Sequence, residues 1–113
     1  MDFAINQDNG TAVIKVNVEK LNASNASGLK AELVLLNKNN VNNIIIDMTS
    51  SKYCDSSGLS AILVANRLCK DTNGKFVLCG LQPNVEKLIS IAQLDKVLTI
   101  TENGEDALAV ISS

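Results

Sequence analysis

The chain has 113 residues, a formal net charge of −2, no histidine and three cysteines. Its hydrophobic content of 46% can supply one aliphatic core, whereas an aromatic content of 3% argues against a stacking platform for single-stranded nucleic acid. Without a run of basic residues we expect no direct nucleic-acid binding, and no apolar stretch is long enough to predict membrane insertion.

The composition also limits the cellular compartment and the cofactors that we expect. The first residues are acidic and lack the basic start of a secretory leader, so we expect a cytoplasmic protein with a single domain over residues 1–113. Cys54, Cys69 and Cys79 match no zinc-binding spacing, which predicts reduced thiols, no metal and no cofactor.

The chain opens with a hairpin signal. Asn9-Gly10 lies between two segments rich in β-branched and aromatic residues, and this dipeptide favours a tight turn between antiparallel strands. The pattern predicts strands at Phe3–Asn6 and Ala12–Val18. Either Asn22 or Ser24 is expected to cap the helix that follows.

The remaining elements alternate between helices and strands. We expect a helix at 25–37, a strand at 44–47, a helix at 57–69, a strand at 76–79, a helix at 83–92, a strand at 97–100 and a helix at 105–111. The order β-β-α-β-α-β-α-β-α predicts an α/β fold with a small, mostly parallel sheet and an antiparallel hairpin strand at its start.

One short polar segment, Asp55-Ser56-Ser57-Gly58, follows the apolar strand at 44–47 and begins a helix at the carboxyl edge of the sheet, where α/β folds place function. Ser56 is either a helix cap or an exposed hydroxyl open to phosphorylation. Gly58 either permits the close approach of another backbone or adopts a special backbone angle.

The helix after this segment is apolar on nearly all sides, whereas a surface helix usually has one apolar stripe. Either the helix is deeply covered or one face is left for a partner. Its apolar residues are Leu59, Ala61, Ile62, Leu63, Val64, Ala65 and Leu68.

The residue types and motifs in the sequence argue against an enzyme. There is no histidine to serve as a base and no glycine-rich phosphate loop, and the acid beside Cys54 disfavours a reactive thiolate. Asp47 and Asp55 lie near one edge, but we expect them to make local hydrogen bonds and not to form a metal or acid–base pair. The helix start leaves nucleotide binding as a third hypothesis, and we expect none.

The residues Ile44-Ile45-Ile46-Asp47 followed by Asp55-Ser56-Ser57-Gly58-Leu59 resemble the centre of a STAS domain of the bacterial anti-sigma factor antagonist family. The similarity extends to the hairpin and to residues 74–80, 83–94 and 97–100, which is nearly the whole chain. It implies a small sheet with helices packed mainly on one face.

The resemblance also implies a function. In the family, the first serine of the motif, here Ser56, is phosphorylated by an anti-sigma factor that is a serine kinase. The unphosphorylated antagonist binds that anti-sigma factor and releases the sigma factor, and a serine phosphatase restores the active form. The residues expected to bind the partner are Asp55, Ser56, Ser57, Gly58, Leu59, Ile62 and Asn22.

One position departs from the family. Members commonly carry Gly-Glu-Leu-Asp, whose aspartate assists phosphoryl transfer, where this chain has Glu19-Lys20-Leu21-Asn22. Because Asn22 carries no charge, an alternative remains open: a non-phosphorylated STAS subunit that docks on an ABC transporter or a signalling complex.

Overall fold

The computed structural model describes residues 2–113 and contains a five-stranded sheet in the order β1-β2-β4-β6-β7. Strand β1 is antiparallel to β2, and each of the other neighbouring pairs is parallel. The strands are β1 (Phe3–Asp8), β2 (Thr11–Val16), β4 (Asn43–Asp47), β6 (Phe76–Cys79) and β7 (Thr99–Thr101). The helices are α1 (Ala26–Lys38), α2 (Ser56–Asp71), α3 (Pro83–Ile91) and α4 (Gly104–Ser112).

The hairpin forms as predicted. Asp8 pairs with Thr11, so Asn9 and Gly10 alone make the turn, with φ angles of 50° and 79°. Positive φ at both central residues is what a type I′ turn requires. Strand β2 ends at Val16, two residues earlier than predicted, because β1 begins at Phe3, the partner of Val16.

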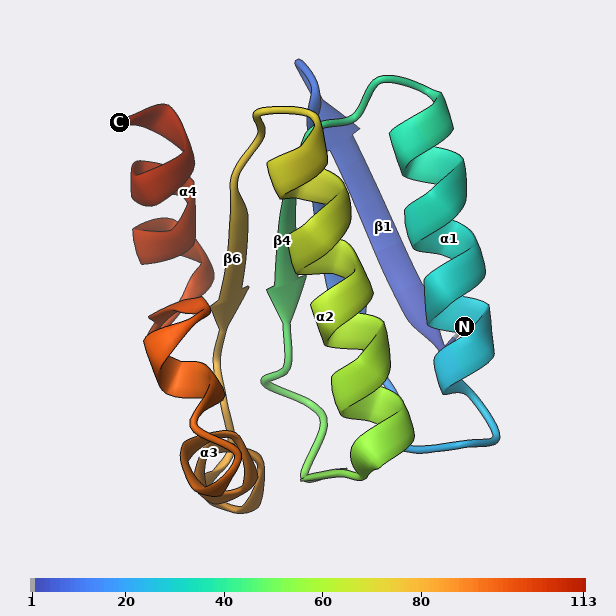
Figure 1. Ribbon diagram of the computed structural model, residues 1–113, viewed down its shortest axis with the longest axis vertical. Coiled ribbons are helices and arrows are strands. Elements are labelled where there is room, and N and C mark those ends of the chain that lie inside the picture. Colours follow the sequence, from blue (N-terminus) through green and yellow to red (C-terminus); the bar gives the residue numbers. More distant parts are fainter. Residues whose placement is uncertain (1) are drawn as a thin grey trace.

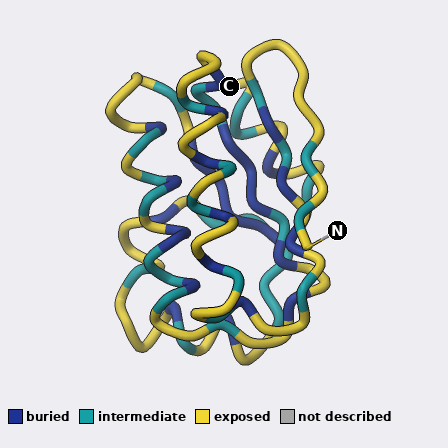
Figure 2. Tube along the Cα trace, turned by 90° about the vertical axis from the view of Figure 1, so that its right-hand side faces the viewer, coloured by how far each residue is buried: buried dark blue, intermediate teal, exposed yellow. Residues whose placement is uncertain are grey.

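Successive side chains of each strand point to opposite faces of the sheet, and a hydrophobic core of different size lies on each face. In β4, Ile44 and Ile46 belong to the larger core with α1, α2 and α3, whereas Ile45 faces the smaller core with α4. In Figure 1, α1 and α2 run side by side across one face of the sheet. Figure 2 shows the buried residues along the strands and on the helix sides that face them. The predicted arrangement, with helices mainly on one face, is confirmed.

Three short elements were not predicted: β3 (Lys20–Leu21), β5 (Tyr53–Cys54) and the 3-10 helix η1 (Leu94–Lys96). Strand β7 begins at Thr99 and not at Val97, because Gln93 adopts a left-handed conformation and the chain then turns through η1. Val97 is therefore 52% exposed instead of lying in the sheet.

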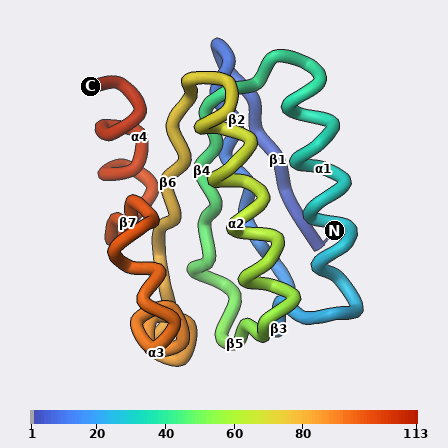
Figure 3. Tube along the Cα trace, viewed as in Figure 1, coloured from blue at the N-terminus to red at the C-terminus, as the bar shows by residue number. Residues whose placement is uncertain are grey.

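Two of the short elements, β3 and β5, lie at the carboxyl edge of the parallel strands. Figure 3 shows β3 and β5 beside the first turn of α2, with α3 at the same end of the sheet. This edge carries the Asp55–Gly58 segment. Within residues 2–113, none of the helices combines the length and apolar character that crossing a bilayer needs.

Candidate functional site

The first turn of α2 is capped by Asp55 and not by Ser56. The Asp55 Oδ1 atom accepts a hydrogen bond from the Gly58 N–H at 3.1 Å, and its carbonyl accepts one from the Leu59 N–H at 3.0 Å. Ser56 is the first helical residue, and its exposed hydroxyl makes no hydrogen bond within residues 2–113. The cap role proposed for Ser56 therefore belongs to Asp55, which leaves the Ser56 hydroxyl accessible at the positive end of the helix dipole.

The loop before α2 is held by the parallel pairing of β3 with β5. Lys20 pairs with Tyr53, and Leu21 pairs with Cys54. The Asp55 N–H then donates to the Leu21 carbonyl at 3.1 Å. A segment more than thirty residues earlier in the chain thus fixes where α2 starts.

Gly58 permits a close approach of this earlier segment. A Cβ atom at Gly58 would lie 2.5 Å from the Cys54 Sγ atom and 2.7 Å from the Leu21 carbonyl oxygen. Its φ is not positive, so no special backbone angle requires glycine here. Of the two explanations offered for Gly58, close packing is the correct one.

Asn22 lies directly after Leu21, next to the site, but its side chain does not cap α1. The Asn22 Oδ1 atom accepts hydrogen bonds from the Ser24 N–H at 3.0 Å and the Ser24 hydroxyl at 2.6 Å. Helix α1 begins after Asn25, whose side chain bridges the Asn22 N–H and the Lys20 carbonyl, both at 2.9 Å. The prediction of an Asn22 or Ser24 cap was wrong, because both residues form a turn ahead of the helix.

Helix α2 buries one face and leaves the other available. The buried residues Gly58, Ala61, Ile62, Ala65 and Cys69 face the sheet and α1. The opposite face forms a shallow apolar hollow of about 570 Å³, which we call the α2 groove. The α2 groove is lined by Ser56, Leu59, Ser60, Leu63, Val64, Arg67, Ala92 and Leu94. The helix is therefore not covered on all sides, and a partner on its open face remains a prediction.

The residues expected to bind a partner differ in exposure: some lie on the surface and others are buried. Ser56 and Leu59 line the α2 groove, and Asp55 is exposed beside it. Ile62 is 0% exposed and Gly58 is buried, so neither offers surface to a partner, and Ile62 is a core residue. Ser57 is half-buried and does not line the α2 groove.

Sequence reasoning missed much of the α2 groove. Helical spacing from Ser56 could have identified Leu63 and Arg67, which lie about two and three turns further along the same face. Ala92 and Leu94 come from the turn between α3 and η1, and no sequence pattern brings that turn to α2.

The other chemistry-bearing groups at this edge have local roles. The Asp47 Oδ1 atom accepts hydrogen bonds from the Thr49 N–H at 2.9 Å and the Thr49 hydroxyl at 2.5 Å, as expected for a loop carboxylate. Burial, and secondarily the Asp55 carboxylate, raises the pKa of the Cys54 thiol to about 11. Cys54 is therefore protonated at neutral pH and a poor nucleophile. Within residues 2–113, no three potential ligands gather to hold a metal ion.

Comparison with known proteins identifies the family. The model of the STAS domain matches residues 2–107. The chain belongs to the STAS domain family. The resemblance seen in residues 44–59 is thereby confirmed, and it applies to nearly the whole STAS chain.

Individual relatives and solved structures are consistent with this family assignment. BtrV of Bordetella bronchiseptica, named as an anti-sigma factor antagonist, is 26% identical over 93 residues, which cover 82% of this chain and 80% of BtrV. A Thermotoga maritima protein described as an anti-sigma factor antagonist has a TM-score of 0.91 at 21% identity, covering 98% of this chain and 95% of its own. Unphosphorylated SpoIIAA superposes with a TM-score of 0.84 at 20% identity, covering 97% and 96% of the two chains. The structural similarities show a shared fold.

Proposed function

We propose that this STAS protein is an anti-sigma factor antagonist: a non-catalytic, cytoplasmic regulator that binds an anti-sigma factor and is switched off by phosphorylation of Ser56. The names of BtrV and the Thermotoga protein support the general role. SpoIIAA has been solved in unphosphorylated and phosphorylated forms, which makes phosphorylation a reasonable switch for a protein of this fold.

The observation that carries the proposal is the position of Ser56. Its exposed hydroxyl lies at one end of the α2 groove, whose walls are mostly apolar. A partner that covers the apolar groove therefore also covers Ser56. Any charge added to that hydroxyl would be enclosed by the complex.

The electrostatics of the helix start suit a switch that acts on binding and not on folding. A phosphate adds about −1.5 to −2 charges, which the roughly +0.5 charge at the start of α2 makes tolerable in the free protein. The Asp55 carboxylate is already present at the same turn. Phosphorylation would thus concentrate more than two negative charges at the rim of an apolar contact, where they lose solvation.

The proposed partner is an anti-sigma factor with serine kinase activity, and a serine phosphatase would reverse the modification. Both assignments rest on the family resemblance together with the accessibility of Ser56.

A second candidate function is a non-phosphorylated STAS subunit docked on an ABC transporter or a signalling complex. Asn22 favours this candidate, because it stands beside the site where family members carry an acid. The α2 groove would serve as the docking surface in that case as well.

Capture of partners from the native cell distinguishes the two candidates. A tagged wild-type chain is expected to retain an anti-sigma factor with a kinase domain. Recovery of a transporter ATPase with no anti-sigma factor would contradict the proposal and support the docking subunit.

We predict that Asn22→Asp accelerates phosphorylation of Ser56 without disturbing the fold. The Asn22 side chain uses its Oδ1 atom to accept hydrogen bonds, and an aspartate can accept the same ones from Ser24. The free energy of unfolding should change by no more than about 0.5 kcal/mol. Phosphorylation by the cognate kinase should be roughly tenfold faster, as expected for one gained contact of about 1.4 kcal/mol in the encounter complex.

The matched control is Asn39→Asp, which adds the same charge at the far end of α1. Its rate of phosphorylation should equal that of the wild type. Equal rates for Asn22→Asp and Asn39→Asp would show that the charge at position 22 has no role in the kinase reaction.

A further inference from the structure

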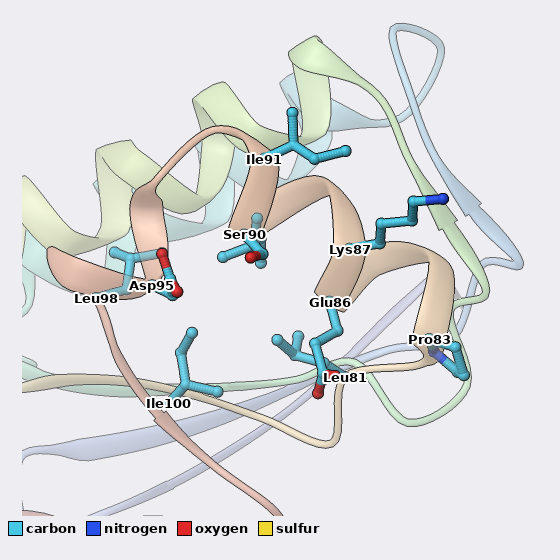
Figure 4. A pocket seen from close by; sticks show the side chains of 10 residues that line it. Leu81, Pro83, Glu86, Lys87, Ser90, Ile91, Asp95, Leu98 and Ile100 are labelled. Carbon is cyan, nitrogen blue, oxygen red and sulfur yellow. The ribbon is translucent and has the colours of Figure 1, made fainter.

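A second hollow lies away from Ser56. It has a volume of about 720 Å³ and lies between α3, η1 and the start of β7 (Figure 4). We call it the α3 pocket. Its volume falls within the roughly 300–1,000 Å³ typical of small-molecule sites.

The floor of the α3 pocket is apolar. Leu81, which follows β6, and Ile100 of β7 line the side opposite α3 (Figure 4). Leu98 and Ile89, which are 6% and 1% exposed, complete the lining and belong to the large core. A ligand in this pocket would therefore rest on a fixed hydrocarbon surface.

Two carboxylates flank this floor from different elements. Figure 4 shows Glu86 of α3 and Asp95 of η1 on opposite sides of the α3 pocket, with Ser90 between them and Lys87 directed away. Both carboxylates and the Ser90 hydroxyl are exposed, and within residues 2–113 none of the three has an ion-pair or hydrogen-bond partner for its side chain. The pocket thus combines apolar contact with two carboxylates, the Lys87 ammonium and a hydroxyl, so its lining carries a net negative charge.

The backbone places Asp95 where it faces the pocket. Helix α3 ends at Ile91, and Gln93, with φ of 60°, turns the chain so that η1 returns beside the helix. A left-handed conformation is uncommon for residues other than glycine, asparagine and aspartate. The turn therefore brings Asp95 to the same hollow that Glu86 of α3 lines.

We propose that the α3 pocket binds a small organic cation with an apolar body. The ammonium group would lie between Glu86 and Asp95, with Ser90 accepting a hydrogen bond from it, and the hydrocarbon would cover Leu81 and Ile100. A cation gains from both carboxylates, whereas an anion is repelled by them. A neutral ligand of the same shape gains only the apolar contact.

This site is separate from the proposed Ser56 switch. Ile91 and Asp95 line the α3 pocket, whereas Ala92 and Leu94 line the α2 groove on the other side of the same turn. The proposal does not depend on Ser56 being phosphorylated or on the identity of an anti-sigma factor.

The experiment is an NMR titration of the whole 15N-labelled chain with three probes of similar shape. They are 2-phenylethylammonium, the neutral 2-phenylethanol and the anionic 3-phenylpropionate. We expect saturable amide shifts at the α3 pocket with the ammonium probe, at least about fivefold weaker binding of the alcohol, and no binding of the carboxylate. The ammonium binding should weaken at high salt, because the carboxylates are exposed to screening.

Variants test the two carboxylates directly. The double variant Glu86→Gln, Asp95→Asn keeps the side-chain shapes and should lower ammonium affinity at least about fivefold, to that of the alcohol. Glu105→Gln, which removes an exposed carboxylate on α4, should leave it unchanged. Thermal melting of each variant verifies that it is folded. Absence of saturable binding, equal binding of ammonium and alcohol, or undiminished binding by the folded double variant would overturn the proposal.

Discussion

Replacing Ser56 with aspartate is expected to weaken binding of the anti-sigma factor by about thirtyfold to several thousandfold while the protein stays folded. The new carboxylate would lie at the end of the α2 groove, under the partner. A charge left buried without a counter-charge costs about 2–5 kcal/mol, which corresponds to that range of affinity.

The fold should tolerate the same substitution. Position 56 is the first residue of α2 and is exposed, and an acid there interacts favourably with the helix dipole. The loss should therefore appear in the dissociation constant, measured by calorimetry with the purified anti-sigma factor, and not in the thermal midpoint.

Two further variants make this result specific. Ser56→Ala removes the hydroxyl without adding charge and should bind within a fewfold of the wild type. Ser27→Asp adds the same charge to an exposed serine in the first turn of α1, outside the α2 groove, and should also bind normally. Undiminished affinity of the Ser56→Asp variant would refute the idea that charge at this hydroxyl controls the complex.

The second large effect concerns Gly58, where we expect alanine to destabilise the protein by about 1–3 kcal/mol. The added Cβ would meet the Cys54 Sγ atom at 2.5 Å and the Leu21 carbonyl oxygen at 2.7 Å. The better helix propensity of alanine, worth about 1 kcal/mol, offsets only part of the strain. The thermal midpoint should fall by several degrees, at about 4 °C per kcal/mol for a chain of this size.

Gly28→Ala is a matched control, because Gly28 is the third residue of α1 as Gly58 is of α2. A Cβ atom at Gly28 would lie at an ordinary 3.6 Å from the ring of Phe3. That substitution should raise stability by about 0.5–1 kcal/mol. If both alanine variants were stabilised, the contact between Leu21 and α2 would not be as tight as described.

The larger elements could be predicted because their signals are local. The Asn9-Gly10 dipeptide specifies its own turn, and Ile44–Ile46 carry enough β-branched surface to indicate a strand buried on both faces. The motif that begins at Asp55 combines a cap with a helix pattern, so the start of α2 was predicted to within one residue.

The parts that could not be predicted depend on contacts between distant segments. The β3–β5 pair has two residues in each strand, too few for any periodicity, and forms only because the fold brings Leu21 to Cys54. The burial of Ile62 follows from which side of α2 faces the sheet, and an all-round apolar helix does not reveal that side. Leu94 follows the left-handed turn at Gln93, and no local pattern indicates that this turn brings it to the α2 groove.

The most direct test of the central claim is mass spectrometry of the protein isolated from its native cell, with intact-mass measurement followed by peptide mapping. The proposed switch predicts a population with one added phosphoryl group, localised to Ser56. Ser60, which lines the same groove, should be unmodified in the same spectra. Unmodified Ser56 under all growth and stress conditions would contradict the switch and leave the docking subunit as the better explanation.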